Sequence, residues 1–282
     1  MNSPQPSGSK RPRAPTVPPM PSGESPQINA KAIKDICGKA EAKILKMSSA
    51  FELHHGRMPD ERTLTETLAY KLGKSAGKIS FHTQAEEGVS GTDLLIQMTL
   101  VGGVADEHAS GSGKAAAPAT ELIVILQAKS YHKNPDKEKE HTEDYKKEKK
   151  PQKGEPERVA GFTYKGGSSG DNRKLQMHLL KDYADEVKKQ NAHAEVIAGY
   201  IVYSGEGKED HEYGKGIAWI PVSDLIEECK KFNKGEDCTQ SDRVLDKELS
   251  REFMELELKK KDNGISKCFL EDVLHDHLDS SV

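Results

Sequence analysis

Polar residues flank two apolar stretches of this chain in an arrangement that could perform metal-assisted chemistry. Asp93 directly precedes an apolar stretch ending at Val101, and Gln127 and Lys129 close a second stretch that starts at Glu121. Such runs, bounded by glycine and polar residues, are typical of buried strands. If the strands pair antiparallel, the start of the first lies beside the end of the second. Side chains alternate along a strand, so Gln127 and Lys129 share a face. The spacing therefore predicts that a carboxylate, an amide and an ammonium meet at one end of a sheet.

These groups suit the hydrolysis of a phosphodiester, which needs an activated water and compensation of negative charge. A divalent cation supplies much of both, and Mg²⁺ prefers oxygen ligands with one or two carboxylates. Asp93, the Gln127 amide oxygen and the Ala128 carbonyl could bind such an ion, and Glu61 could complete the set. Lys129 could orient or deprotonate the attacking water. Taken singly, Asp93 is also explained as a turn residue and Lys129 as a charge that reaches solvent.

The second acid must come from a helix predicted over Asp60 to Lys74. Its apolar stripe consists of Leu64, Leu68 and Leu72. Glu61 borders the buried face, about 60° round the helix from Leu64, whereas Glu66 lies on the solvent side. Glu66 is also explained as the partner of Thr63 in a capping box. We therefore expect Glu61, rather than Glu66, to point at the site.

The ordered set of motifs resembles the PD-(D/E)XK nuclease superfamily, in the variant where Gln replaces the second acid. Gly-Thr-Asp at 91–93 and Gln-Ala-Lys at 127–129 are similar to the core of methylation-directed restriction endonucleases of the Mrr type. A group of uncharacterised nuclease-like domains is more similar. It adds a helix with Glu and Leu-Thr, here within 61–68, and a helix carrying Gln, here within 176–183. The similarity covers residues 60–204, about half the chain.

This resemblance implies a restriction-endonuclease-like fold and a deoxyribonuclease that uses Mg²⁺ or Mn²⁺. The residues that it assigns to the site are Asp93, Gln127, Lys129 and Glu61. It also suggests that Gln176 lines the substrate site, although a helix-surface amide explains this residue almost equally well. Glu87 and Tyr131 are weaker candidates. One alternative is a nuclease-like fold without catalysis that binds nucleic acid or protein, because Gln127 in place of an acid should weaken metal affinity. A third hypothesis places the function in the low-complexity segments.

Composition limits the classes of partner and location. The chain has 282 residues and a formal net charge of −4, which argues against polyanion binding by bulk charge, so contacts with DNA would be local. The four cysteines show no C-x-x-C spacing and suggest a reducing interior rather than a disulfide scaffold. No apolar run approaches the roughly 18 residues of a membrane span. We expect an intracellular protein, cytoplasmic or nuclear, without membrane association. The oligomeric state stays open, a homodimer included.

The domain organisation follows from changes in composition. Residues 1–27 are rich in Pro, Ser and Gly and predict a disordered tail. Residues 28–282 predict a single α/β domain whose mixed central sheet is flanked by helices, with low-complexity insertions at 102–120 and 133–158. The strands are expected at 78–84, 92–101, 121–130, 196–203 and 216–220. The remaining helices are expected at 28–53, at 174–190, from a Ser223 cap to Phe232, and from Asp242 onward.

Overall fold

The computed structural model describes most of the predicted domain but not the low-complexity segments. The described residues are 27–55, 58–73, 78–81, 87, 90–101, 120–133, 158–165, 174–204 and 216–262. The segments predicted to be disordered, 1–27, 102–120 and 133–158, lie outside the described residues, apart from four residues at the ends of these segments. Those four, which belong to strands, are Gln27, Thr120, Lys133 and Arg158.

The fold is α/β, with a mixed sheet in the order β1-β3-β4-β7-β8 and with β2 beside β3. The strands of this sheet are β1 (Gln27–Asn29), β2 (Lys78–Phe81), β3 (Leu94–Val101), β4 (Thr120–Ser130), β7 (Glu195–Ser204) and β8 (Gly216–Pro221). β3 and β4 pair antiparallel, as predicted, while β4 and β7 run parallel. A small second sheet pairs β5 (His132–Lys133) with β6 (Arg158–Val159).

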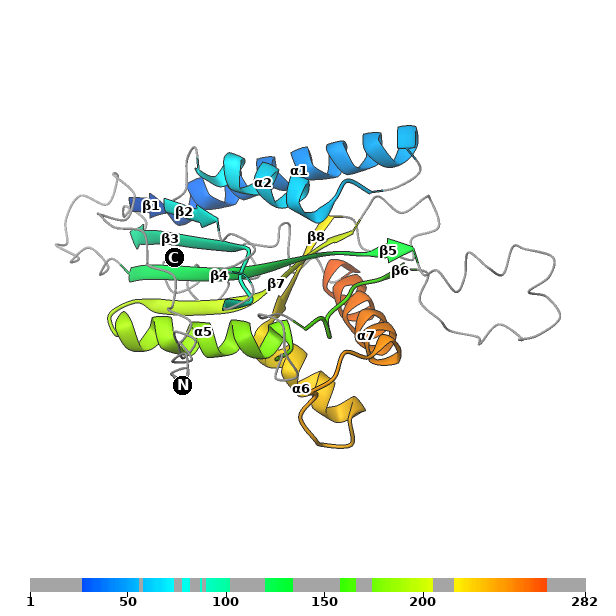
Figure 1. The fold of residues 1–282 in the computed structure, drawn as a ribbon. Helices are drawn as coiled ribbons and strands as arrows, with labels where there is room; N and C mark the ends of the chain where they lie inside the picture. Colours follow the sequence, from blue (N-terminus) through cyan, green and yellow to red (C-terminus); the bar gives the residue numbers. More distant parts are fainter. Residues whose placement is uncertain are drawn as a thin grey trace, which may run out of the picture.

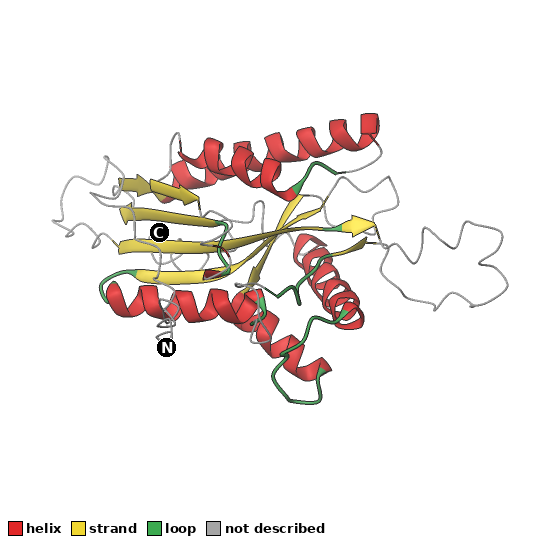
Figure 2. Cartoon of the chain, viewed as in Figure 1, coloured by secondary structure: helices red, strands yellow, loops and turns green. Residues whose placement is uncertain are grey.

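Helices cover both faces of the sheet (Figures 1 and 2). They are α1 (Ala30–His55) and α2 (Glu61–Gly73) on one face, and α5 (Gln176–Gln190), α6 (Val222–Phe232) and α7 (Arg243–Asp262) on the other. Alternate residues of β4 contribute side chains to two apolar cores. Val124 packs towards α1 and α2, and Ile125 packs towards α5 to α7. This explains why β4 is apolar without interruption. None of the helices in the described ranges is long and apolar enough to cross a membrane.

Several local predictions are wrong, and each has a physical reason. Residues 28 and 29 belong to β1, which pairs with the end of β3, so the helix begins at Ala30. The cap of α2 is Asp60, whose carboxylate accepts the Thr63 N–H at 2.8 Å; Glu66 instead pairs with Arg62. α6 begins at Val222 directly after β8, which places Ser223 inside the first turn rather than at a cap.

The buried face of α5 begins with the first residue of the helix. Gln176, Met177 and Leu180 are buried together with Tyr183 and Val187, whereas Leu179 is only half-buried. Leu175, directly before the helix, is also buried, so the first turn of α5 is already packed against the core.

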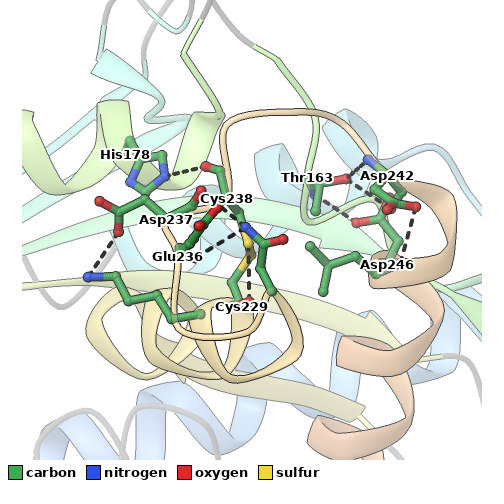
Figure 3. The surroundings of a disulfide bond; sticks show 11 residues. Thr163, His178, Cys229, Glu236, Asp237, Cys238, Asp242 and Asp246 are labelled. Carbon is green, nitrogen blue, oxygen red and sulfur yellow. Dashed lines mark hydrogen bonds and ion pairs between the residues drawn. A yellow bond between two sulfur atoms is a disulfide. The ribbon is translucent and has the colours of Figure 1, made fainter.

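The disulfide Cys229–Cys238 contradicts the expectation of free thiols at these positions (Figure 3). It joins α6 to the connection before α7, with the Cα atoms 6.2 Å apart. The Cys238 carbonyl also lies 2.8 Å from the His178 ring nitrogen on α5. The nine-residue separation matches no short cysteine motif, so spacing in the sequence did not indicate the pair.

The start of α7 fixes a short segment, Ala160 to Lys165, against the core. The Thr163 N–H donates to the Asp246 carboxylate at 2.7 Å, and the Asp242 N–H donates to the Thr163 hydroxyl at 2.8 Å (Figure 3). The Ala160 N–H donates to the Ser250 hydroxyl at 3.0 Å. Burial raises the pKa of Asp246, and the hydrogen bonds from Thr163 partly offset this. α7 therefore has a structural function that its charged sequence did not reveal.

Candidate active site

The site lies where β4 continues past the start of β3. The last backbone hydrogen bond between the two strands runs from the Asp93 N–H to the Leu126 carbonyl, at 2.9 Å. β4 continues to Ser130, still paired with β7 on its other side. Backbone groups of Leu126 and Ala128 face the same side of a strand, so Ala128 has no strand partner on the β3 side among the described residues. This edge of the sheet is the place where the predicted polar residues meet.

Two acids occupy the position of the missing strand. The Asp93 carboxylate accepts the Ala128 N–H at 2.7 Å, and the Glu61 carboxylate accepts the N–H of Ser130. Glu61 is the first residue of α2, and Asp93 directly precedes β3. Both acids therefore satisfy backbone groups that would otherwise be buried without partners. This structural function holds whether or not the site is catalytic.

Asp93 lies in an environment that resists its ionisation. The Gln127 amide nitrogen donates to its carboxylate at 2.6 Å. Burial and the nearby Glu87 raise the pKa of Asp93 to about 7, although the Ala128 N–H and Lys129 lower it in part. A carboxyl with this pKa changes charge near neutral pH, which is a common property of functional sites.

Lys129 lies between Glu61 and an exposed aromatic ring. Its Nζ is 3.8 Å from a Glu61 oxygen, and only 12% of its side chain is exposed. The same Nζ lies 5.8 Å from the centre of the Tyr164 ring. Burial raises the pKa of Glu61, and Lys129 and the Ser130 N–H partly offset this. The structure thus brings Glu61 to Lys129, as expected, and leaves Glu66 exposed beside Arg62.

The weaker candidates divide into two groups. Gln176, at the start of α5, is buried and donates to Glu87 at 2.7 Å, and Glu87 acts electrostatically on both Asp93 and Glu61. These two residues therefore belong to the surroundings of the site. Tyr131, by contrast, is buried in the core that faces α5 to α7.

Gly91 allows the turn before β3 to pack against α5. Its φ angle is +65°, in the left-handed region that favours glycine. A Cβ atom here would lie 2.6 Å from the Gln176 carbonyl oxygen and 2.9 Å from the Leu180 nitrogen. A glycine is therefore needed both for backbone conformation and for space, and it sets the distance from Asp93 to α5.

Buried polar atoms in this region have capacity for a further ligand. The side-chain oxygens of Gln127 and Gln176 and the Tyr200 hydroxyl are buried without a hydrogen-bond partner among the described residues. Tyr200 pairs with Gln127 across β4 and β7, and its pKa is raised by burial and by Asp93. Groups of this kind call for a water, an ion or a substrate atom.

The donor set suits a hard cation that accepts few charged ligands. Asp93, the Gln127 amide oxygen and the Ala128 carbonyl are all oxygen donors, as Mg²⁺ and Mn²⁺ prefer. Within the described ranges, no three His, Cys, Asp or Glu side chains are grouped to hold an ion. An ion here would therefore depend on the amide and the backbone carbonyl as well as on carboxylates.

Two residues near the site had no role in the sequence predictions. Tyr164 lies in a segment without apolar periodicity, and Tyr200 lies within a continuous apolar run that indicates only a core strand. Neither context distinguishes a site residue from its neighbours. Comparison with known proteins adds no further assignment, since no protein-family model matches the sequence and no curated protein is significantly similar to it. The structure therefore establishes the fold class of this protein, which is an α/β fold with a mixed sheet flanked by helices.

Proposed function

We propose that this protein is a metal-dependent nuclease that hydrolyses phosphodiester bonds in DNA, on a restriction-endonuclease-like fold. The observation that carries the proposal is the partly buried Asp93 carboxyl, held between the Gln127 amide and the Ala128 N–H. It shares a largely buried corner with Glu61 and Glu87, and Lys129 is the cation that acts on it there. Such an excess of acid over base favours the binding of a cation.

The chemical groups at the site assign a role to each residue. Asp93, the Gln127 amide oxygen and the Ala128 carbonyl would hold Mg²⁺ or Mn²⁺, which when bound supplies Lewis acidity and an activated water. Lys129 would place its positive charge beside the phosphate and stabilise the charge that grows there. Glu61 would orient the Lys129 ammonium, which lies 3.8 Å away.

The pKa of Asp93 gives this proposal a dependence on pH. The carboxyl binds an ion when it is ionised, and its pKa is raised to about 7. Protons therefore compete with the metal below neutral pH. Metal affinity and cleavage should both rise as the pH increases through about 7, because the carboxyl is then already ionised and the ion displaces no proton.

A second function, a binding module without catalysis, is favoured by one specific observation. Asp93 and Glu61 satisfy the N–H groups of β4, so both acids have a structural reason to be present. Gln127 also turns its amide nitrogen, rather than its oxygen, towards Asp93. Such a domain would retain the surface beside Lys129 and would bind nucleic acid or protein without hydrolysing it.

Cleavage of labelled single- and double-stranded DNA with Mg²⁺ and with Mn²⁺ tests the proposal. Lys129→Ala should abolish cleavage while leaving the fold intact, and Asp93→Asn should remove metal binding and cleavage together. The matched control is Lys181→Ala, which removes an exposed lysine from an ion pair with Asp185 on α5 and should leave cleavage unchanged. If the wild-type protein cleaves with neither metal and Gln127→Glu gains no activity, the binding module is the better conclusion.

A further inference from the structure

Tyr164 is unusual because it is exposed directly after two buried residues. Its side chain is 59% exposed, while Phe162 and Thr163 are completely buried. Large aromatic side chains are mostly buried in folded proteins, so exposed ones at a site with convergent polar groups are candidates for ligand contacts. The two buried residues before it thus fix the backbone from which this ring projects.

The backbone around Tyr164 is held from two directions. Its carbonyl accepts the Gln176 N–H from the start of α5 at 2.9 Å, and Lys165 forms a bridge with Leu175. On the other side, Thr163 is bound to Asp242 and Asp246 at the start of α7 (Figure 3). A ring presented by a fixed backbone loses less conformational entropy when it binds a ligand.

The position of the ring beside Lys129 suits a nucleotide. The Lys129 ammonium is 5.8 Å from the ring centre, so a phosphate at the ammonium leaves an attached base close to the ring. Tyrosine presents a large flat apolar surface, and bases of every type stack on such surfaces. One lysine and one aromatic ring therefore form the pair of contacts that single-strand binding sites combine.

We propose that Tyr164 is a stacking platform for an unpaired nucleobase, so that the site takes single-stranded DNA. This inference rests on the proposed function, whose substrate class it narrows. A base within a duplex is covered on both faces by its neighbours and would have to leave the stack to reach the ring. A net charge of −4 also offers little of the extended phosphate contact on which duplex binding depends.

Fluorescence anisotropy at fixed salt, in EDTA to prevent cleavage, tests the inference. The probes are a labelled single strand, an abasic strand of the same length, and the duplex of the same sequence. Tyr164→Ala should weaken binding of the single strand by about 5- to 150-fold, the range of base–aromatic stacking. Tyr164→Phe, which keeps the ring, should bind as the wild type does. The abasic strand should bind equally weakly to the wild-type protein and to Tyr164→Ala.

Tyr70 provides a matched control within the same chain. It is also 59% exposed, and the Lys71 ammonium lies 6.0 Å from its ring centre. It sits on α2 nine residues after Glu61, which is about 13 Å along the helix axis. Tyr70→Ala should therefore leave the affinity for every probe unchanged.

The inference fails if the wild-type protein binds the abasic strand as tightly as the intact strand, prefers the duplex, or binds no strand at all. It also fails if Tyr164→Ala loses no affinity. A parallel cleavage assay with Mn²⁺ separates it from the proposed function. Base-dependent binding through Tyr164 without cleavage would support the inference and refute the nuclease. Cleavage that does not depend on Tyr164 would support the nuclease and refute the inference.

Discussion

Replacing Asp93 with Asn should stabilise the fold at alkaline pH. Asn keeps an oxygen that can accept the Ala128 N–H but cannot ionise. The pKa of Asp93 is raised from its ordinary value of 3.8 to about 7. The folded protein therefore holds a proton that the unfolded chain releases, and the free energy of unfolding falls as the pH rises from about 4 to about 7.

The size of the effect follows from this shift. At about 1.4 kcal/mol for each pKa unit, ionisation of this partly buried carboxyl lowers the free energy of unfolding by at most about 4 kcal/mol above pH 7. Between pH 5 and pH 8 the wild-type protein should lose about 2 to 3 kcal/mol through Asp93. The Asn variant should lose none of this free energy of unfolding. The difference in stability between the variant and the wild type should therefore grow by the same amount.

Urea denaturation in EDTA at pH 5 and pH 8 measures this difference. Trp219, the only tryptophan, is buried in the core and reports unfolding by fluorescence. Asp182→Asn is the control, since Asp182 is exposed on α5 and paired with Lys174. The reasoning would be refuted if the difference in the free energy of unfolding between Asp93→Asn and the wild type were the same at both pH values. A variant that is less stable at pH 8 would refute it as well.

Three further predictions concern the site. Gln127→Glu should raise Mn²⁺ affinity about tenfold or more, because it adds a charged oxygen beside Asp93; calorimetric titration measures this, and unchanged affinity would exclude Gln127 as a ligand. Glu61→Gln should slow cleavage about 10- to 100-fold by releasing Lys129, whereas Glu66→Gln should have no effect in the same assay. Gly91→Ala should lower the free energy of unfolding by about 1 to 2 kcal/mol for its left-handed backbone alone, and urea denaturation with no loss would contradict the close approach to α5.

The sequence predicted the part of the site that depends on strand periodicity. Alternation and apolar length were enough to pair β3 with β4 and to bring Asp93 beside Gln127. The position of Glu61 followed from the helical period of α2. The rest depends on contacts between distant segments, which periodicity does not encode. Examples are the hydrogen bond from Thr163 to Asp246 on α7 and the disulfide between Cys229 and Cys238.

The other wrong predictions concerned the N-terminal caps of α2 and α6. Predictions of caps depend on single residues, and the observed cap lay two or three positions before the predicted one. Asp60 was a better cap for α2 than the box that Thr63 and Glu66 would have formed. At α6 the strand before it runs directly into the helix and leaves Ser223 no capping position. Local chemistry of this kind is decided by where the preceding element ends.

The paired strand ends have a consequence for how this chain can change over evolution or be engineered. The connection after β3 starts and finishes beside the Leu100–Thr120 pair, and the connection after β5 starts and finishes at the Lys133–Arg158 pair. Since the cost of closing a loop grows only slowly with its length, a longer or shorter chain between the residues of either pair should leave the β3–β4 register, and with it the position of Asp93, unchanged. One insertion point therefore lies between two strands of the main sheet and the other between the two strands of the small sheet, and a reporter domain or a second recognition module could be added at either.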